Sequence, residues 1–134
     1  MSPDFAREWI KKAKADQMAA LRALQDARHG KDQAEIACFH AQQCVEKYMK
    51  AILAVSGQPI PRTHDLLSVE LIIRKNCNLN MKRLLPCLRR LGQYAVEIRY
   101  PGATASVKDA ISAISAMGKI IEFFIPRLNK LLET

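Results

Sequence analysis

The sequence predicts an all-α protein: an antiparallel, up-and-down four-helix bundle with one additional short helix. Apolar residues recur at helical spacing in five stretches, and no stretch alternates apolar and polar residues over the length of a strand. Glycine or proline separates most of these stretches. The 134 residues contain no internal repeat, low-complexity tract or linker, so we expect one domain over residues 1–134 with its own core.

The first predicted helix begins at Ser2-Pro3 and ends at Gly30. Ser2 supplies a capping hydroxyl, Pro3 suits the first helical position because its missing N–H costs nothing there, and Gly30 suits a left-handed cap. Asp16 interrupts the apolar seam, where it could reach solvent or face a basic group across the bundle. The seam consists of Phe5, Trp9, Ala13, Ala20, Leu21 and Leu24.

The second predicted helix begins at Asp32, which forms a capping-box pattern with Glu35, and Gly57 stops it. Glu46 and Lys50 are four residues apart and can pair. A polar row follows another face at i, i+3 and i+7: His40, Gln43 and Lys47. The core side comprises Ala37, Ala41, Cys44, Tyr48, Ala51, Ile52 and Val55.

Thr63 or Asp65 can cap a third helix that ends at about Lys75. A fourth helix is predicted over residues 81–99; Pro86 lies inside it, so either the regular helix begins near Pro86 or its first turn is kinked. The third helix has the apolar residues Leu66, Leu67, Val69, Leu71, Ile72 and Ile73. The buried face of the fourth comprises Leu84, Leu85, Leu88, Leu91, Tyr94, Ala95 and Ile98.

Ser106 and Asp109 form a Ser-x-x-Asp capping box for the last predicted helix. Pro126 should kink this helix near Glu122, because proline has no N–H to donate. The seam comprises Ala110, Ile114, Met117, Ile121, Phe124, Leu128 and Leu131. Three further side chains widen the apolar surface and could serve a partner: Ile111, Ile120 and Ile125.

The net charge of +8 fits a polyanionic partner such as nucleic acid or nucleotide, but a generally basic surface kept soluble by charge explains it equally well. The densest positive patch comprises Arg74, Lys75, Lys82, Arg83, Arg89 and Arg90. No apolar run approaches the roughly 20 residues that span a bilayer, and the N-terminus has no signal pattern. We therefore expect a cytoplasmic protein with no membrane contact.

The four cysteines form no CxxC pair and have few histidines near them. Reduced and mostly buried thiols, with no metal site, are the expected outcome.

The second helix also carries a specific motif: Phe39-His40-Ala41-Gln42-Gln43, then Glu46-Lys47, then Lys50-Ala51. This motif resembles the signature helix of the HEPN domains (higher eukaryotes and prokaryotes nucleotide-binding). Three further segments fit the family in order along the chain: Trp9, Ala13 and Asp16 in the first helix, Pro61-Arg62-Thr63-His64-Asp65-Leu66 before the third, and Arg99-Tyr100-Pro101 before the last. The resemblance covers nearly the whole chain.

The resemblance implies an all-α bundle that usually forms homodimers. It also implies a prokaryotic context, where small HEPN proteins are often encoded beside a minimal nucleotidyltransferase as a two-component, toxin–antitoxin-like pair. Many members are metal-independent ribonucleases. These carry an arginine, four to six residues and then a histidine near the last helix, and the two copies face each other across the dimer.

This sequence departs from the ribonuclease pattern. Arg99 matches the arginine, but the expected histidine positions hold Thr104, Ala105 and Ser106. Arg22 and His29 have the right spacing but lie at the end of the first helix, where we interpret the match as chance. Histidine suits deprotonation of a 2′-hydroxyl and arginine does not. We therefore assign no catalytic residue, expect no cofactor, and favour binding over catalysis.

The matched motifs predict a nucleotide or phosphate site. One cluster could converge between the first, second and fourth helices: Asp16, His40, Lys47 and Arg99. His64 and Asp65 could lie at the mouth of the bundle. The alternative for both clusters is a buried polar network that selects one packing of the bundle. The predicted site residues are Asp16, His40, Gln43, Lys47, His64, Arg99 and Tyr100.

Three functions remain open. The first is a nucleotide- or RNA-binding or regulatory component of a two-component system with a minimal nucleotidyltransferase. The second is a metal-independent ribonuclease toxin with a non-standard residue set, in which His40 or His64 is the base. The third is a helical dimeric adaptor without a ligand, whose seam is the last helix.

Overall fold

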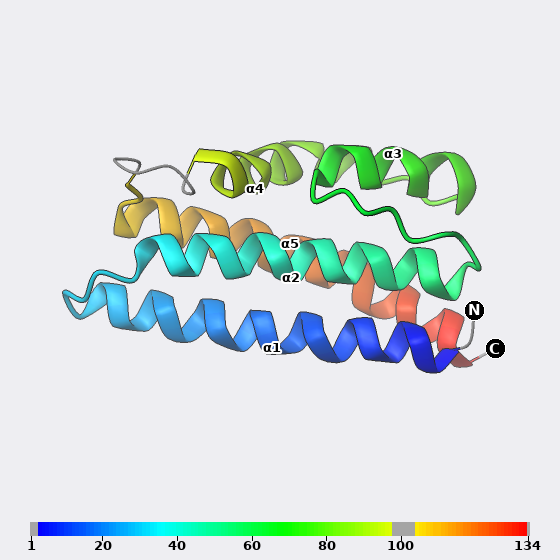
Figure 1. Cartoon of the computed structure of the whole chain (residues 1–134), viewed down its shortest axis with the longest axis horizontal. Coiled ribbons are helices and arrows are strands. Elements are labelled where there is room, and N and C mark those ends of the chain that lie inside the picture. The colour runs from blue at the N-terminus through cyan, green and yellow to red at the C-terminus, as the bar shows by residue number, and fades with distance from the viewer. Residues whose placement is uncertain (1–2, 98–103, 134) are drawn as a thin grey trace.

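The computed structural model describes residues 3–97 and 104–133, and all regular structure in these ranges is helical (Figure 1). This confirms the all-α prediction, with α3 as the short additional helix. The elements in chain order are α1 (Pro3–Arg28), α2 (Ala34–Val55), α3 (Leu66–Asn76), the 3-10 turn η1 (Lys82–Leu84), α4 (Leu85–Glu97) and α5 (Val107–Glu133).

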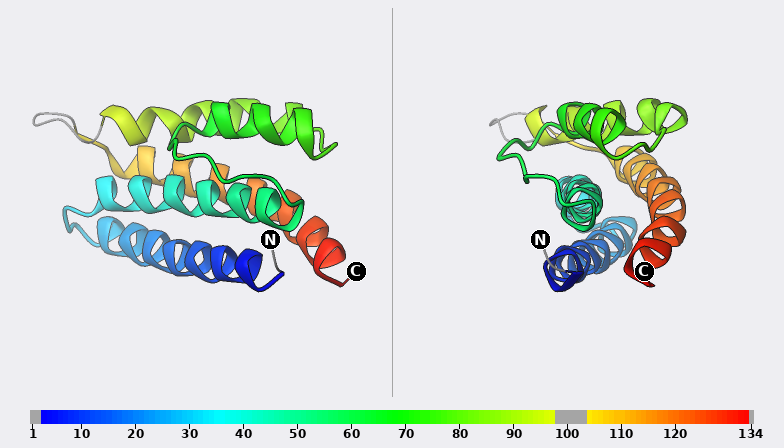
Figure 2. Two further views of the ribbon diagram at one scale, coloured as in Figure 1. Left: turned by 45° about the vertical axis from the view of Figure 1, so that its right-hand side comes forward. Right: turned by 90° about the vertical axis from the view of Figure 1, so that its right-hand side faces the viewer.

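The central element is α2, which contacts α1, α3, α4 and α5. Figure 1 shows α1 along one side of α2 and the pair α3 and α4 along the other, and the end-on view in Figure 2 shows α5 closing the bundle behind them. The beginning of α1 and the end of α5 lie at the same end of the bundle.

Because α2 is surrounded, most of its faces are buried. The predicted core side is confirmed except at Val55, which is half-buried. A second apolar face is also buried: Cys38, Val45, Met49, Leu53 and Ala54. Three polar residues of α2 are buried as well, and they belong to the candidate site: Gln42, Glu46 and Lys50.

Gly30 and Gly57 end α1 and α2 as predicted. Both have positive φ, +85° and +73°, a conformation that glycine adopts without a clash at Cβ. After α2, the Gly57 N–H donates to the Ala54 carbonyl at 3.1 Å and the Gln58 N–H to the Leu53 carbonyl at 2.9 Å. These two bonds form a Schellman motif, which satisfies carbonyls at the helix end.

The starts of α4 and α5 also agree with the sequence. The Asp109 N–H donates to Ser106 Oγ at 3.0 Å and the Ser106 N–H donates to Asp109 Oδ2 at 2.9 Å, which is the predicted capping box. Pro86 is the second residue of α4, so the regular helix begins near this proline. A proline fits the first turn because its missing N–H has no intrahelical partner there.

The predicted capping box at the start of α2 is wrong. Gln33 is the N-cap and makes no side-chain capping bond, so Asp32 lies one position too early. The cause is the turn after α1, in which the Gln33 N–H donates to the Lys31 carbonyl. At α3, Asp65 occupies the N-cap as predicted, but its carboxylate accepts from the Ser68 hydroxyl rather than from a backbone N–H.

Several bulky side chains predicted in the helix seams are exposed instead. On α1, Phe5 and Leu21 are exposed, and the buried face carries Ala6, Ala13, Ala20, Ala23, Leu24 and Ala27. Small residues allow α1 to lie close to α2, and a close interface leaves no room for larger side chains. Leu131 of the predicted α5 seam is exposed as well, as are two apolar residues of α3, Leu67 and Leu71.

The helix α5 continues past Pro126 without interruption, and its C-terminal part bends toward α1 (Figure 2). The bend agrees with the predicted effect of a residue that cannot donate a helical hydrogen bond. Ile120 is fully buried in the core, so it cannot contribute to a partner surface as predicted. Within residues 3–97 and 104–133, no helix has the length and apolar character needed to cross a membrane.

Candidate functional site

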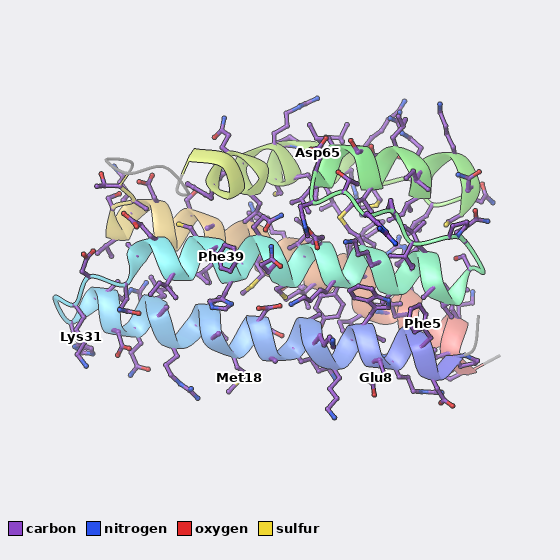
Figure 3. The ribbon with its side chains drawn as sticks, viewed as in Figure 1. Phe5, Glu8, Met18, Lys31, Phe39 and Asp65 are labelled. Atoms are coloured by element: carbon purple, nitrogen blue, oxygen red, sulfur yellow. The ribbon has the colours of Figure 1, made fainter. Side chains whose placement is uncertain are left out.

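Polar side chains gather along one side of α2, facing α1 and the segment 56–65 (Figure 3). They form two clusters, and each is built around one buried carboxylate. Two members of the predicted row on α2, His40 and Lys47, join the first cluster, because residues seven apart lie on the same face of a helix.

The first cluster is centred on Asp16 of α1. Its Oδ1 lies 2.8 Å from His40 Nδ1, and its Oδ2 accepts a hydrogen bond from Lys47 Nζ. The Asp16 side chain is only 10% exposed. A buried carboxylate needs counter-charges and donors, and both come from α2. The predicted convergence is therefore confirmed for Asp16, His40 and Lys47.

The second cluster is centred on Glu46 of α2, whose side chain is 3% exposed. Its Oε2 accepts from Lys50 Nζ at 3.2 Å, the predicted i, i+4 pair. Its Oε1 lies 2.9 Å from Nδ1 of His64, which comes from the extended segment before α3 and is 60% exposed. The sequence motifs include both residues, but nothing in their spacing indicates that they meet.

Two glutamines connect the segment 56–65 to α2. The Gln43 amide donates to Gln42 Oε1 at 2.9 Å, and the Gln42 amide donates to the His64 carbonyl at 3.2 Å. His64 is thus held through both its ring and its backbone. Gln42 is fully buried, so it positions His64 rather than facing solvent. We did not predict this role, although Gln42 lies inside the matched motif.

Trp9 of α1 extends the second cluster. Lys50 Nζ lies 5.6 Å from the Trp9 ring centroid, a cation–π contact, and Phe5 packs edge-on against the same indole at 6.2 Å. A cavity of about 260 Å³ opens here, lined by Phe5, Glu8, Trp9 and Lys12. Figure 3 labels Phe5 and Glu8 at this end of α1.

The two clusters share a geometry. In each, a carboxylate binds Nδ1 of a histidine, which leaves Nε2 on the far side of the ring. When Nδ1–H donates to the carboxylate, Nε2 of a neutral ring accepts a proton or a hydrogen bond; when the ring is protonated, Nε2–H donates. His40 is 30% exposed, so both histidines reach solvent. The arrangement can bind phosphate and can also transfer a proton.

Asp65, which was predicted to lie beside His64, does not join either cluster. Asp65 is exposed, and its carboxylate accepts from Ser68. Arg99 and Tyr100 lie outside the described residues. In residues 3–97 and 104–133, no group of three or more His, Cys, Asp or Glu is arranged to hold a metal ion.

Two cysteines of α2 lie within the core. Burial raises the pKa of the Cys38 and Cys44 thiols from 9.0 to about 12, with smaller contributions from the charges of Asp109 and Asp16 respectively. Both are therefore protonated near neutral pH and poor nucleophiles. The prediction of buried thiols is confirmed for these two; Cys77 and Cys87 are half-buried.

The fold and the motif-bearing second helix together define the class of this protein. The family model described as HEPN domain matches residues 6–128. The chain belongs to the HEPN domain family. A protein of Methanocaldococcus jannaschii named Putative toxin MJ1304 is 32% identical over 103 residues, which cover 72% of this chain. They cover 64% of that relative, so this chain matches less than two thirds of its length.

Two solved structures share the fold over nearly their whole length. The crystal structure of TT1696 from Thermus thermophilus matches with a TM-score of 0.74 and 23% identity, covering 94% of this chain and 97% of that one. The crystal structure of ST0689, described as an archaeal HEPN homologue, matches with a TM-score of 0.70 and 26% identity, covering 92% and 97%.

Proposed function

We propose that this chain, acting as one domain over residues 1–134, is the HEPN component of a cytoplasmic toxin–antitoxin-like pair and binds nucleotide or RNA along α2. Family membership, the relative named Putative toxin MJ1304 and a net charge of +8 support this role. We further propose a minimal nucleotidyltransferase as the partner protein. Co-purification of the two proteins from co-expressing cells tests the partnership, and independent elution would contradict it.

The observation that carries the proposal is that two histidines beside one side of α2, His40 of α2 and His64 of the segment before α3, are each held by a buried carboxylate. His40 and His64 are oriented through Nδ1, so their Nε2 atoms are pre-positioned for a ligand. A ring nitrogen held in this way donates to phosphate with little entropy cost. Gln43 is half-buried in the same row and offers an amide. We propose that Arg99 and Tyr100 complete the site, since arginine binds phosphate through two N–H groups.

The test is binding of fluorescently labelled single-stranded RNA and of ATP, measured by anisotropy. His40→Ala and His64→Ala should each weaken binding by about tenfold, the worth of one charge-assisted hydrogen bond. Both variants should fold, because Asp16 keeps Lys47 and Glu46 keeps Lys50.

The matched control is His29→Ala, which alters the third histidine, exposed after α1. Affinities of the His40 and His64 variants equal to that of the control would show that α2 is not the binding site. Arg99→Ala should also weaken binding, and normal binding by that variant would exclude Arg99 from the site.

A second function, metal-independent RNA cleavage, is favoured by the same carboxylate–histidine geometry. A base held by a carboxylate can take the proton of a 2′-hydroxyl, whose oxygen then attacks the adjacent phosphorus. The bond from phosphorus to the 5′-oxygen breaks, so the products are a 2′,3′-cyclic phosphate and a 5′-hydroxyl that takes its proton from water. The assay uses single-stranded and structured RNA in the presence of a chelator. Cleavage that is lost in His40→Ala or His64→Ala but kept in His29→Ala would identify a ribonuclease. If the wild-type protein does not cleave RNA, the ribonuclease function is contradicted and the binding function remains.

A further inference from the structure

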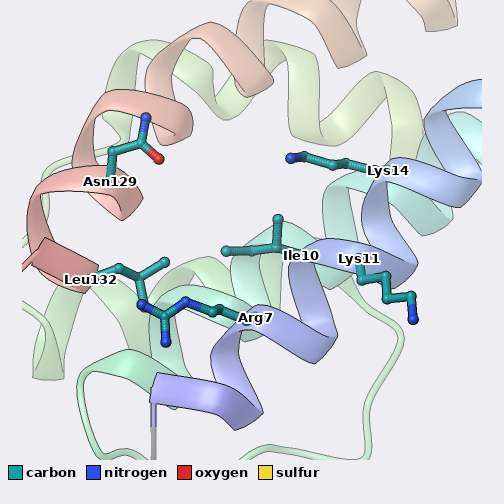
Figure 4. Close-up of a pocket in the computed structure, with 6 residues that line it drawn as sticks. All are labelled: Arg7, Ile10, Lys11, Lys14, Asn129 and Leu132. Atoms are coloured by element: carbon teal, nitrogen blue, oxygen red, sulfur yellow. The ribbon is translucent and has the colours of Figure 1, made fainter.

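A second cavity lies on the opposite side of α1 from the Asp16 cluster. It has a volume of about 350 Å³ and separates the N-terminal half of α1 from the last turns of α5 (Figure 4). Side chains two residues apart on a helix point to nearly opposite sides, so Lys14 faces this cavity while Asp16 faces α2. The lining residues are Arg7, Ile10, Lys11, Lys14, Asn129 and Leu132.

The lining is strongly basic. Arg7, Lys11 and Lys14 follow one side of α1, and none of the lining residues within 3–97 and 104–133 is acidic. In the described part of the chain, Arg7 pairs only with Asp4, at 3.4 Å and with both side chains largely exposed. An exposed ion pair of this kind contributes little to stability, so Arg7 can release Asp4 and bind a ligand instead. Figure 4 shows Lys14 extending across the opening toward α5, whereas Lys11 points away.

The rest of the lining is not suited to an inorganic ion alone. Ile10 and Leu132 are half-buried and give the cavity apolar walls, one from each helix. Asn129 of α5 adds an amide that both donates and accepts hydrogen bonds. The cationic side chains suit a phosphate, the apolar walls suit a flat ring, and the amide suits polar atoms at the edge of that ring. The lining therefore matches a ligand that contains both a phosphate and such a ring. The volume lies at the lower end of the range of small-molecule sites.

We propose that this α1–α5 cavity binds a nucleoside phosphate, either free or as the 5′-phosphorylated end of an RNA strand. The phosphate lies between Arg7 and Lys14, the ring lies against Ile10 and Leu132, and Asn129 meets a polar edge of the base or sugar. The site uses neither His40, Lys47 nor His64, so it is independent of the binding site proposed on α2.

The test is an NMR titration of isotopically labelled protein with AMP and, separately, with a short 5′-phosphorylated RNA. Either ligand should shift the amide signals of Ile10, Lys14 and Asn129. The double variant Arg7→Gln/Lys14→Gln should weaken binding at least about tenfold, since it removes two charge-assisted contacts. Lys108→Gln/Lys119→Gln removes the same charge from exposed positions of α5 outside the cavity and should change affinity less than about twofold.

Three results would overturn the proposal. The first is that only amide signals of α2 shift. The second is that the two double variants weaken ligand binding equally, and the third is that inorganic phosphate binds the cavity with the same affinity as AMP. Shifts with AMP support a free nucleotide, and shifts only with the RNA support a strand end. The variant His40→Ala/His64→Ala should keep the cavity shifts. If the cavity signals still shift in this variant while RNA binding on α2 is lost, the cavity site is distinguished from the site of the proposed function.

Discussion

Asp16 is a buried carboxylate of α1 that is balanced by two side chains of α2, His40 and Lys47. Such a group stabilises the fold only while its partners are present, because a buried charge without partners is costly. The contact with Asp16 also fixes the orientation of the His40 ring. The stability of the fold and the binding function proposed above therefore both depend on Asp16.

We predict that Asp16→Asn lowers the free energy of unfolding by about 2 kcal/mol, because Lys47 loses its counter-charge in a partly buried position. Urea unfolding followed by circular dichroism measures the change. The matched control is Asp26→Asn, whose pair with Lys31 is exposed and 3.9 Å long. The control should change stability by less than about 0.5 kcal/mol. Equal effects would show that Asp16 is not a structural anchor.

Cys38 and Cys44 predict how stability depends on pH. Their pKa values are raised by burial from 9.0 to about 12, so between these values the unfolded chain loses protons that the folded chain keeps. Stability should be constant up to about pH 8 and fall as pH rises above 9, by about 1 kcal/mol per thiol at pH 10.

Denaturant unfolding at pH 8, 9 and 10 measures this slope. Cys38→Ala/Cys44→Ala should flatten the slope, whatever its effect on stability at pH 8. Cys77→Ala/Cys87→Ala alters the two half-buried cysteines and serves as the control. A slope that is the same in all three proteins would contradict the prediction.

At the scale of the helices, the ends are defined by local hydrogen bonds. The box of Ser106 and Asp109 begins α5, and the Schellman bonds at Gly57 end α2. Each motif involves only a few neighbouring residues. A single substitution therefore measures how much each motif contributes to the free energy of unfolding.

We predict that Ser106→Ala lowers the free energy of unfolding by about 1 kcal/mol, because the Asp109 N–H loses its acceptor. Ser115→Ala, on the exposed face of α5, should be neutral or slightly stabilising, since alanine is the better helix former. Thermal unfolding of both variants checks the difference, and a Ser106 variant as stable as the Ser115 variant would argue against the cap.

Substitution of Gly57 by alanine should cost about 1 kcal/mol, because the residue has φ +73° and alanine is strained in that region. Gly92 lies within α4 with open space around it, so Gly92→Ala should instead stabilise by up to about 1 kcal/mol. Urea unfolding should therefore show a lower free energy of unfolding for the Gly57 variant and a higher one for the Gly92 variant. A destabilised Gly92 variant would show that α4 does not tolerate a side chain at this position.

For the whole molecule, we predict a homodimer that uses an exposed part of α5. Ile111 is 41% exposed and Ile125 is half-buried, whereas Ile120 belongs to the core. Ile111→Glu should therefore lower the mass measured by light scattering from dimer toward monomer, because it places a charge in an apolar contact. Leu67→Glu introduces the same charge on an exposed position of α3 and should leave the mass unchanged. A monomeric wild type at high concentration would contradict the dimer.

The sequence by itself determined the helices, most of their ends and the family. Helical periodicity, the glycine caps and the Ser106–Asp109 box depend on residues a few positions apart, so a local pattern contains the necessary information. The polar row on α2 was predictable for the same reason, since its members share one helix face. The HEPN motifs then placed the candidate site on this helix.

The matched motifs predicted that Asp16, His40 and Lys47 converge, but only the tertiary structure decided which polar atoms of different elements make contact. Asp16 and Lys47 are 31 residues apart and Glu46 and His64 are 18 apart, so helical spacing cannot indicate either contact. The rotation of α1, which buries alanines and exposes Phe5 and Leu21, depends on how closely α2 approaches. The cavity between α1 and α5 likewise exists only after packing brings Arg7 and Lys14 opposite Asn129 and Leu132. The packing of helices that are distant in the sequence therefore brings the local polar row of α2 together with its partners in the candidate site.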